Sequence, residues 1–243
     1  MKTANFPVIP AKPGGFVPKP KIKRAAILRP ADIRHVLRVI DATSRWPERD
    51  AVAVLISVCV GMRCSEIARI TPRDILTPDG TVKPEVGLRA AITKGCNPRT
   101  AYFTHPKLIA AIQRYIADRV AKRVGTTGDL AFGGLCPDVP FLFSSRKGGF
   151  SLVRKVRLLE SGVREEYSAA DGLEATFRRI FDRSGLPECS SHAGRRTFAS
   201  TLLAKGVSSD DVSKLLGHSA LDNTVPYLEC TDRMLEDAFR DVF

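Results

Sequence analysis

The chain has 243 residues, 44% of them hydrophobic and 26% charged, which fits one sizeable folded core and excludes a wholly disordered or fibrous chain. Lys and Arg number 38 against 26 Asp and Glu, giving a formal net charge of +12 and a pI near 9.7. This balance indicates a polyanionic partner, either nucleic acid or an anionic membrane surface.

The apolar runs disfavour the membrane alternative. The longest one, Ala51 to Val60, falls well short of the about 20 residues that a membrane-spanning helix needs. We therefore interpret this run as a buried core helix. The N-terminus has no unbroken apolar stretch of the kind found in a secretory signal, so we expect a cytoplasmic protein without a membrane partner.

Six cysteines are present, with no CxxC pair and no spacing typical of metal ligands. A chain of this size without a disulfide framework is typical of a reducing compartment. We expect free thiols, no bound metal and no cofactor.

Residues 1–30 differ from the rest of the chain in composition. They contain seven basic residues, six prolines and no acidic residue, so they cannot form a hydrophobic core. This composition fits a solvated tail and fits equally a basic arm that lies along phosphates. In the second case, Lys19, Lys21, Lys23 and Arg24 are candidate DNA contacts.

Helical periodicity begins at Asp32 and continues to about Thr43, with apolar residues at i, i+3, i+4 and i+7. Asp50 can cap a second helix that runs through Val60 to a stop at Gly61, and Ser65 can cap a short third helix that begins at Glu66. Arg63 therefore lies at a junction between two helices.

The middle of the chain is of β type. Residues 86–93 and 99–104 predict two strands of a hairpin, joined by a turn over residues 94–98. A helix over residues 108–120 follows from its apolar spacing. A Gly-rich connection over residues 125–140 then leads to the next apolar stretch.

The apolar residues 141–143 predict a short strand. Residues 145–170 are charged and weakly periodic, and we interpret them as an insertion with some helix. From Asp171 onward the pattern is helical, with stops at Gly185, Gly206 and Gly217 and a last short amphipathic helix that ends near Val242. The predicted fold is mainly α with a small antiparallel β-sheet, formed by residues 31–243 as one domain.

Five short polar motifs occur in order along these elements: Gly61-Met62-Arg63-Cys64-Ser65-Glu66, Thr93-Lys94-Gly95, His192-Ala193-Gly194-Arg195, Leu215-Leu216-Gly217-His218 and Thr224-Val225-Pro226-Tyr227. This series, with nine residues from His218 to Tyr227, resembles the tyrosine recombinase (phage integrase) family over about residues 31–243, the family's catalytic domain. The resemblance implies a DNA strand-breaking and rejoining enzyme that works as a tetramer on two duplexes of a mobile element or its target.

Two arginines suit the chemistry of a phosphodiester, whose oxygens gain negative charge in the transition state. Arg63 and Arg195 can each donate bidentate, permanently charged hydrogen bonds to the nonbridging oxygens, which a lysine does less well. The family resemblance assigns them this pairing.

Tyr227 is the candidate nucleophile, because a covalent 3′-phosphotyrosyl link conserves the energy of the broken bond and allows rejoining without ATP. A phenol with an ordinary pKa near 10 needs activation at neutral pH. A cationic surrounding favours the phenolate, and the resemblance makes His192 the group that accepts the proton.

Lys94, on the hairpin turn, is the candidate general acid for the 5′-oxygen leaving group. The resemblance further implies that His218 hydrogen-bonds the phosphate and that Glu66 supports the site by orienting one of the cations. No metal takes part in this scheme.

The sequence departs from the family in two respects. Pro226 directly precedes Tyr227, removes an amide donor and disfavours helical geometry for Val225. Only about thirty residues precede the catalytic domain, where most members have a helical core-binding domain. Three explanations stay open: the basic arm takes its place, an accessory DNA-bending or core-binding protein does so, or the chain is a trimmed form of a longer protein.

Two alternatives stay open at this point. One is a DNA-binding regulator or accessory protein that retains the fold without turnover, and the other is an enzyme like a type IB topoisomerase that relaxes supercoils. A topoisomerase rejoins the cut strand within its own duplex, whereas a recombinase joins it to a partner duplex, and this difference distinguishes the two enzymes.

Deletion of the basic arm should weaken binding about equally for specific and random DNA, since its lysines and arginines release counterions from phosphates without reading bases. The slope of log affinity against log salt, measured by fluorescence anisotropy, should become shallower by up to about 0.9 for each phosphate that the shortened protein no longer neutralises. An unchanged slope would show that the arm is a solvated tail.

Overall fold

The computed structural model describes residues 26–93, 98–144, 148–158 and 164–217, and these ranges contain nine helices and four strands. The strands form two separate two-stranded antiparallel sheets. The predicted fold class, mainly α with a small antiparallel β component, is therefore confirmed. Among the described residues no helix is both long and apolar enough to cross a membrane.

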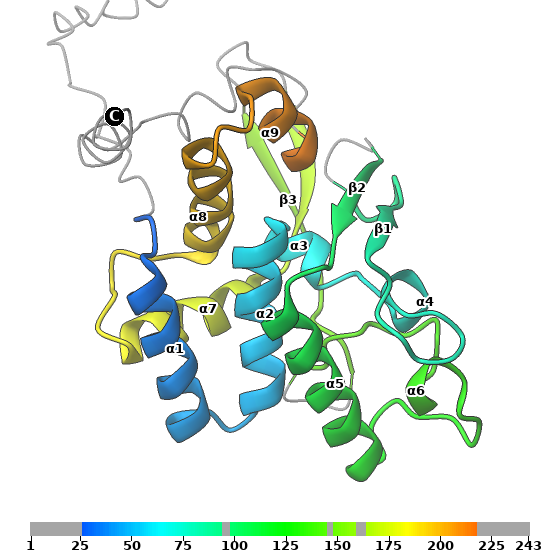
Figure 1. The fold of residues 1–243 in the computed structure, drawn as a ribbon. Coiled ribbons are helices and arrows are strands. Elements are labelled where there is room, and N and C mark those ends of the chain that lie inside the picture. The colour runs from blue at the N-terminus through cyan, green and yellow to red at the C-terminus, as the bar shows by residue number, and fades with distance from the viewer. Residues whose placement is uncertain (1–25, 94–97, 145–147, 159–163, 218–243) are drawn as a thin grey trace, which may run out of the picture.

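Helix α2 (Pro47–Val60) lies at the centre of the structure (Figure 1). Three other helices pack against it: α1 (Pro30–Thr43), α5 (Pro106–Ala121) and α8 (Ser191–Ala204). The apolar run predicted to be a core helix belongs to α2, and its residues 52–56 are almost entirely buried. The prediction of a buried helix, rather than a membrane span, is confirmed.

The start of α2 differs from the prediction. The helix begins at Pro47, where the missing N–H costs no helical hydrogen bond, rather than at a cap formed by Asp50. Asp50 instead lies inside the first turn, where its carboxylate accepts hydrogen bonds from Arg49 and Ser44. The end of α2 agrees with the prediction: the helix stops at Gly61, which adopts the left-handed conformation with φ +70°.

Two short helices follow, α3 (Cys64–Ile67) and α4 (Pro72–Ile75). The predicted cap of α3, Ser65, is wrong, because Arg63 occupies the cap position. The carboxylate of Glu66 accepts the backbone N–H of Arg63 at 2.8 Å, which satisfies a donor that a helix start leaves free.

The first hairpin pairs β1 (Glu85–Leu88) with β2 (Arg99–Tyr102), with Glu85 opposite Tyr102. The predicted first strand was too long, since residues 89–93 form a turn in which Ile92 N–H donates to the carbonyl of Arg89. The centre of the predicted connection, residues 94–97, lies outside the described residues.

The segment after α5 contains the short helix α6 (Ala131–Gly134) and then residues 141–143, which do not form the predicted strand. Phe141 and Leu142 are completely buried, and the N–H of Phe141 donates to the carbonyl of Ile70 at 2.7 Å. The apolar character of this segment therefore reflects burial against the loop after α3, not pairing with a strand.

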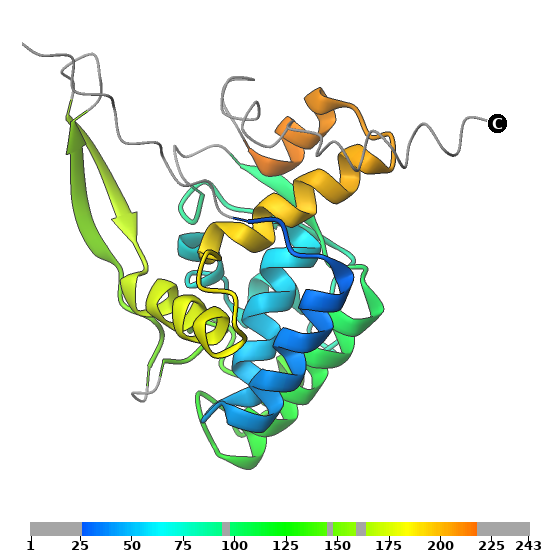
Figure 2. The same cartoon turned by 90° about the vertical axis from the view of Figure 1, so that its left-hand side faces the viewer.

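The predicted insertion at residues 145–170 contains no helix among its described residues. It forms a second hairpin of β3 (Val153–Leu158) and β4 (Arg164–Ala169), which extends away from the helices (Figure 2). On the hairpin Arg154 lies 3.4 Å from Glu166 of the other strand, and Lys155 lies 2.6 Å from Asp171, which follows the hairpin in the chain. The expectation of helix fails because cross-strand pairs, which local periodicity does not reveal, stabilise the extended conformation.

The C-terminal part of the described chain is helical, as predicted. Helix α7 (Asp171–Arg183) leads to α8 and then to α9 (Ser209–Leu216), which ends at Gly217 with φ +62°. Ser190 and Ser208 cap the starts of α8 and α9. The predicted last helix lies outside the described residues.

Residues 26–30, which composition assigns to the arm, include one that contacts the folded core. Leu28 is buried, and its N–H donates to the hydroxyl of Thr197 on α8 at 2.8 Å. Helix α1 then begins at Pro30. A deletion that removes only the arm should accordingly stop before residue 26.

Gly194→Ala should destabilise the protein by about 1–3 kcal/mol, because α8 crosses α2 too closely for a methyl group at this position. An added Cβ would lie 2.3 Å from the hydroxyl oxygen of Ser57 and 2.8 Å from its Cβ. Urea unfolding followed by circular dichroism measures the effect. Gly172→Ala, where the nearest atom to the added Cβ is 3.4 Å away in Phe150, is the control and should be nearly neutral.

Candidate functional site

The candidate site is built around the carboxylate of Glu66, in α3, whose side chain has no exposed surface. Its Oε1 accepts from Nη1 of Arg63 at 2.9 Å. Its Oε2 accepts the backbone N–H of Arg63 and also Nη2 of Arg99 at 2.7 Å. One buried carboxylate therefore orients two guanidinium groups that come from different parts of the fold.

The charge state of Glu66 follows from competing effects. Burial raises the pKa of its carboxyl, but the guanidinium groups of Arg99, Arg195 and Arg63 together outweigh burial and hold this pKa below its ordinary value. Glu66 is therefore ionised at neutral pH. With three arginines around one carboxylate, the cluster keeps an excess of positive charge, which suits an anionic ligand.

The same three arginines bind the C-terminal end of α9. Arg99 Nη1 donates to the carbonyl of Leu215 at 2.6 Å, Arg195 Nη2 to that of Leu216, and Arg63 Nη2 to that of Gly217 at 3.4 Å. The last carbonyls of a helix lack partners within it and carry the negative end of its dipole. Three cations thus fix the position where the chain leaves α9.

Arg195 connects α8 to the end of α2. Its Nη1 donates to the carbonyl of Gly61 at 2.6 Å, and its side chain is almost fully buried, with 1% of the residue exposed. Arg63 is more accessible, with 18% of its side chain exposed. Of the two arginines predicted to bind phosphate, Arg63 is therefore the one that reaches the surface.

His192 lies in the first turn of α8 and is exposed. Its backbone N–H donates to the Ser190 hydroxyl at 3.3 Å, which fixes the start of the helix. His192 precedes Arg195 by three residues, so both side chains lie on the same face of α8. The structure thus brings Arg63, Glu66 and Arg195 together and places His192 one helical turn away from Arg195.

Arg99 is the component that sequence reasoning missed, because it was assigned only as the start of a strand. In β2 the residues alternate between buried and exposed, and Arg99 and Ala101 occupy the buried positions. A charged residue at an inward position of a strand requires a partner, since an unpaired buried charge is very costly. That alternation is the signal that could have identified Arg99.

Within the described ranges, no three or more His, Cys, Asp or Glu side chains are grouped so that they could hold a metal ion. The cysteines described there are free: Cys59, Cys64, Cys136 and Cys189. The charge stabilisation that these residues offer comes from guanidinium groups.

Residues 27–234 of the chain match the phage integrase family. The chain belongs to this family. It is 26% identical over 208 residues to the tyrosine recombinase XerA of Pyrococcus furiosus, a match that includes 84% of this chain and 58% of that protein. The chain thus spans less than two thirds of that relative's length.

Solved structures of two recombinases share the fold of this chain. A crystal structure of XerA recombinase aligns with a TM-score of 0.63 at 17% identity, over 88% of this chain and 64% of that one. The site-specific recombinase XerH, in a post-cleavage complex with its palindromic difH substrate, aligns with a TM-score of 0.57 at 17% identity, over 89% of this chain and 53% of that one.

The other predicted site residues of this family member lie outside the described residues. These are Lys94, His218 and Tyr227, together with the arm residues Lys19, Lys21, Lys23 and Arg24. The described chain stops at Gly217, the residue that precedes His218 and whose carbonyl Arg63 contacts. The roles of these residues remain the predictions made from the sequence.

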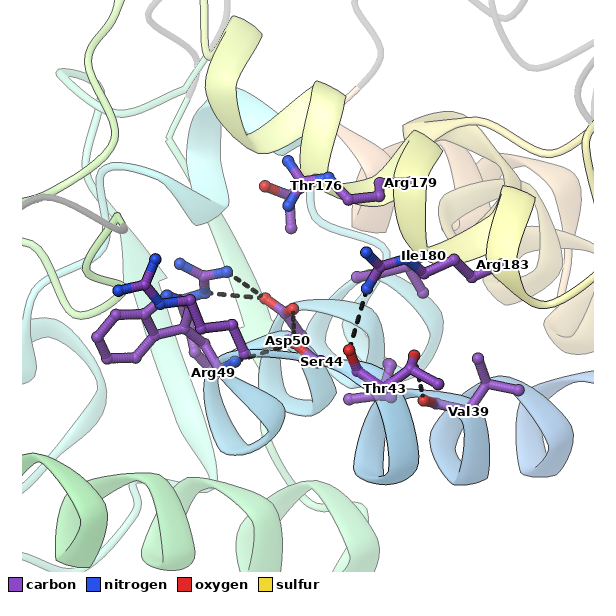
Figure 3. A pocket seen from close by; sticks show the side chains of 12 residues that line it. Val39, Thr43, Ser44, Arg49, Asp50, Thr176, Arg179, Ile180 and Arg183 are labelled. Atoms are coloured by element: carbon purple, nitrogen blue, oxygen red, sulfur yellow. Dashed lines mark hydrogen bonds and ion pairs between the residues drawn. The ribbon is translucent and has the colours of Figure 1, made fainter.

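A separate cavity of about 260 Å³ lies between the end of α1, the start of α2 and α7 (Figure 3). Arg49 and Asp50 form a buried ion pair at its wall, with Nη2 and Oδ1 2.7 Å apart. Because the pair lies in the first turn of α2 and the Gly61 carbonyl bound by Arg195 lies just past its other end, a rise of 1.5 Å per residue separates the two by roughly 15 Å. The cavity is therefore not part of the candidate site.

Glu66→Gln should reduce stability at pH 7 by about 3–5 kcal/mol, because it leaves buried guanidinium groups without their carboxylate. The folded pKa of Glu66 is lowered, so the stabilisation is complete above its unfolded pKa of about 4.3 and is lost as the pH falls toward the folded value. Urea unfolding at pH 7 and pH 3.5 should show a smaller pH-dependent loss in the variant than in the wild type.

Glu188→Gln removes an exposed carboxylate and is the control for this measurement. It should leave both the stability and its pH dependence close to those of the wild type. An equal pH dependence in wild type and Glu66→Gln would contradict the assignment of an ionised, stabilising Glu66.

Proposed function

We propose that the chain is the catalytic domain of a site-specific DNA recombinase or integrase, which cleaves and rejoins DNA strands through a 3′-phosphotyrosyl intermediate. The observation that carries this proposal is the cluster of Arg63, Arg99 and Arg195 around Glu66 and the end of α9. Such a cluster presents fixed positive charge where a phosphate must gain negative charge, without a metal ion.

Arg63 is best placed to bind the scissile phosphate first. Its Nη1 is fixed by Glu66, whereas its Nη2 makes only a long contact of 3.4 Å with the Gly217 carbonyl. A phosphate oxygen can replace that weak contact and gain a charge-assisted hydrogen bond. Arg195, being buried, reaches a phosphate oxygen only after the atoms that cover it move aside.

The reaction balances as a transesterification. The phenol oxygen of Tyr227 attacks the phosphorus while its proton passes to His192, and the bond from phosphorus to the 5′ oxygen breaks as Lys94 donates a proton to that oxygen. The reverse reaction with a 5′ hydroxyl from another duplex reseals the strand. His192 is accessible in the first turn of α8, as a proton acceptor must be.

The substrate in this proposal is double-stranded DNA. The strongly basic chain supports it, as does the relation to XerH, which is bound to a DNA substrate. Exchange of two duplexes requires four strand cleavages, so we propose a tetramer on DNA, with an accessory DNA-bending or core-binding protein as a further partner. The proposed location is the cytoplasm.

The similarity to recombinases favours this function over a DNA-binding regulator and over a type IB topoisomerase. The XerA relative is a tyrosine recombinase, and XerH is a site-specific recombinase. Neither a regulator without turnover nor a topoisomerase of type IB is favoured by them.

Tyr227→Phe should abolish the covalent protein–DNA adduct and leave duplex affinity within about threefold, since it removes one oxygen and no positive charge. The substrate is a duplex selected from a random library by binding to the wild-type chain and then nicked next to each possible cleavage position. A denaturing gel detects the adduct, and anisotropy measures the affinity.

Tyr102→Phe, at an exposed position of β2, is the matched control and should form adduct as the wild type does. Adduct formation by the Tyr227→Phe variant would show that another residue is the nucleophile. Transfer of the cut strand to a second duplex, rather than back to its own, distinguishes a recombinase from a topoisomerase.

A further inference from the structure

We infer that Arg99 is a positioning residue for strand cleavage: by binding Glu66 and the end of α9 at once, it fixes the relative positions of three segments that lead to the candidate catalytic residues. This inference rests on the proposed function. Arg99 touches neither DNA nor the reacting atoms in this scheme. It acts through Arg63 and through the chain that leaves α9.

The contacts of Arg99 join parts of the chain that are far apart in sequence. Its Nη2 binds Glu66 Oε2 at 2.7 Å, across 33 residues, and its Nη1 binds the Leu215 carbonyl at 2.6 Å, across 116 residues. Glu66 in turn binds Arg63. A single planar group therefore sets the distance between α3 and the end of α9.

Arg99 is also the first residue of β2 and follows Lys94 by five residues. The three segments that it joins are thus the strand that follows Lys94 in the sequence, the helix that begins after Arg63, and the helix end that precedes His218. Lys94 and His218 themselves lie outside the described residues.

The burial of Arg99 indicates a positional role rather than simple stabilisation. Only 4% of its side chain is exposed, and its Nε is buried without a hydrogen-bond partner. A buried ion pair usually stabilises no more than well-packed apolar side chains of equal volume do. The guanidinium offers what an apolar side chain lacks, two directed hydrogen bonds to two separate elements.

The absence of a side chain at Gly217 leaves space for the side chain of Arg99. Its φ of +62° is in the left-handed region, and a Cβ at this position would lie 2.7 Å from Cδ of Arg99. A side chain there would push the guanidinium from its place even though every hydrogen-bonding group of Arg99 would remain. Gly217→Ala therefore displaces Arg99 without removing its charge.

The chain offers a matched control in Arg49. Its side chain is 6% exposed, it binds Asp50 through two nitrogens, and its Nη1 donates to the Phe143 carbonyl at 3.2 Å. Arg49 thus has the same kinds of partner as Arg99. It lies beside Asp50 in the first turn of α2 (Figure 3), whereas the candidate site lies near Gly61, just past the other end of this helix. A loss of stability alone should be similar for both arginines.

The test compares Arg99→Met, Arg99→Lys and Gly217→Ala with Arg49→Met. Single-turnover cleavage of the nicked duplex is measured at saturating DNA, together with the DNA Kd and the Tm. Arg99→Met and Gly217→Ala should cleave about 100-fold more slowly than wild type, because small misplacements of reacting groups cost this much. Their Kd should stay within about threefold.

Arg99→Lys should recover only part of the rate, since one ammonium group cannot reach both acceptors in the planar geometry of a guanidinium. Arg49→Met should lower the Tm by a similar amount but cleave within about threefold of the wild-type rate at a temperature where all variants are folded. Equal rates for Arg99→Met and Arg49→Met would overturn the inference, and so would full recovery in Arg99→Lys.

A second measurement does not depend on cleavage. Hydrogen exchange of peptides that cover residues 209–217 should accelerate in Arg99→Met and Gly217→Ala and remain unchanged in Arg49→Met. Unchanged exchange in Arg99→Met would overturn the positioning role. A wild-type chain that forms no adduct would instead contradict the proposed function, and the exchange result would still decide whether Arg99 holds the end of α9.

Discussion

The geometry of the site depends on the buried carboxylate of Glu66. It accepts hydrogen bonds from the side chains of Arg63 and Arg99 and from the backbone that begins α3. Without this anion, positive groups would be brought together in a poorly solvated space, where their repulsion is strong. The single negative charge of Glu66 reduces the repulsion among the three guanidinium groups. The cluster keeps a net positive charge, which favours binding of a phosphate.

The second constraint is the end of α9, whose carbonyls accept hydrogen bonds from all three arginines. These contacts extend the network from α3 and β2 to the last described helix. Arg195 adds the end of α2 through the Gly61 carbonyl. The central helix of the core and the helix ends around it are therefore held in one arrangement by directional hydrogen bonds, and the apolar packing around α2 supplies the frame that buries them.

Local sequence signals were sufficient for most helices and for several of their ends. The periodic apolar residues of α1 and α5 indicated those helices, and Gly61 and Gly217 marked ends because both adopt positive φ. The order of the motifs indicated the family, and the predicted helix end at Gly61 placed Arg63 between two helices. Local signals failed for the β3–β4 hairpin and for residues 141–143, where pairing partners and burial determine the conformation.

The sequence by itself determined the helical fold class, the positive charge and the residue types needed for phosphate chemistry, because each depends on composition or on spacing within a few turns. Only the tertiary structure decided that Arg99 belongs to the site and that three arginines share one helix end. The physical reason is distance along the chain: Arg195 and Gly61 are 134 residues apart, and Arg99 and Leu215 are 116 apart. Such hydrogen bonds arise only after the helices have packed.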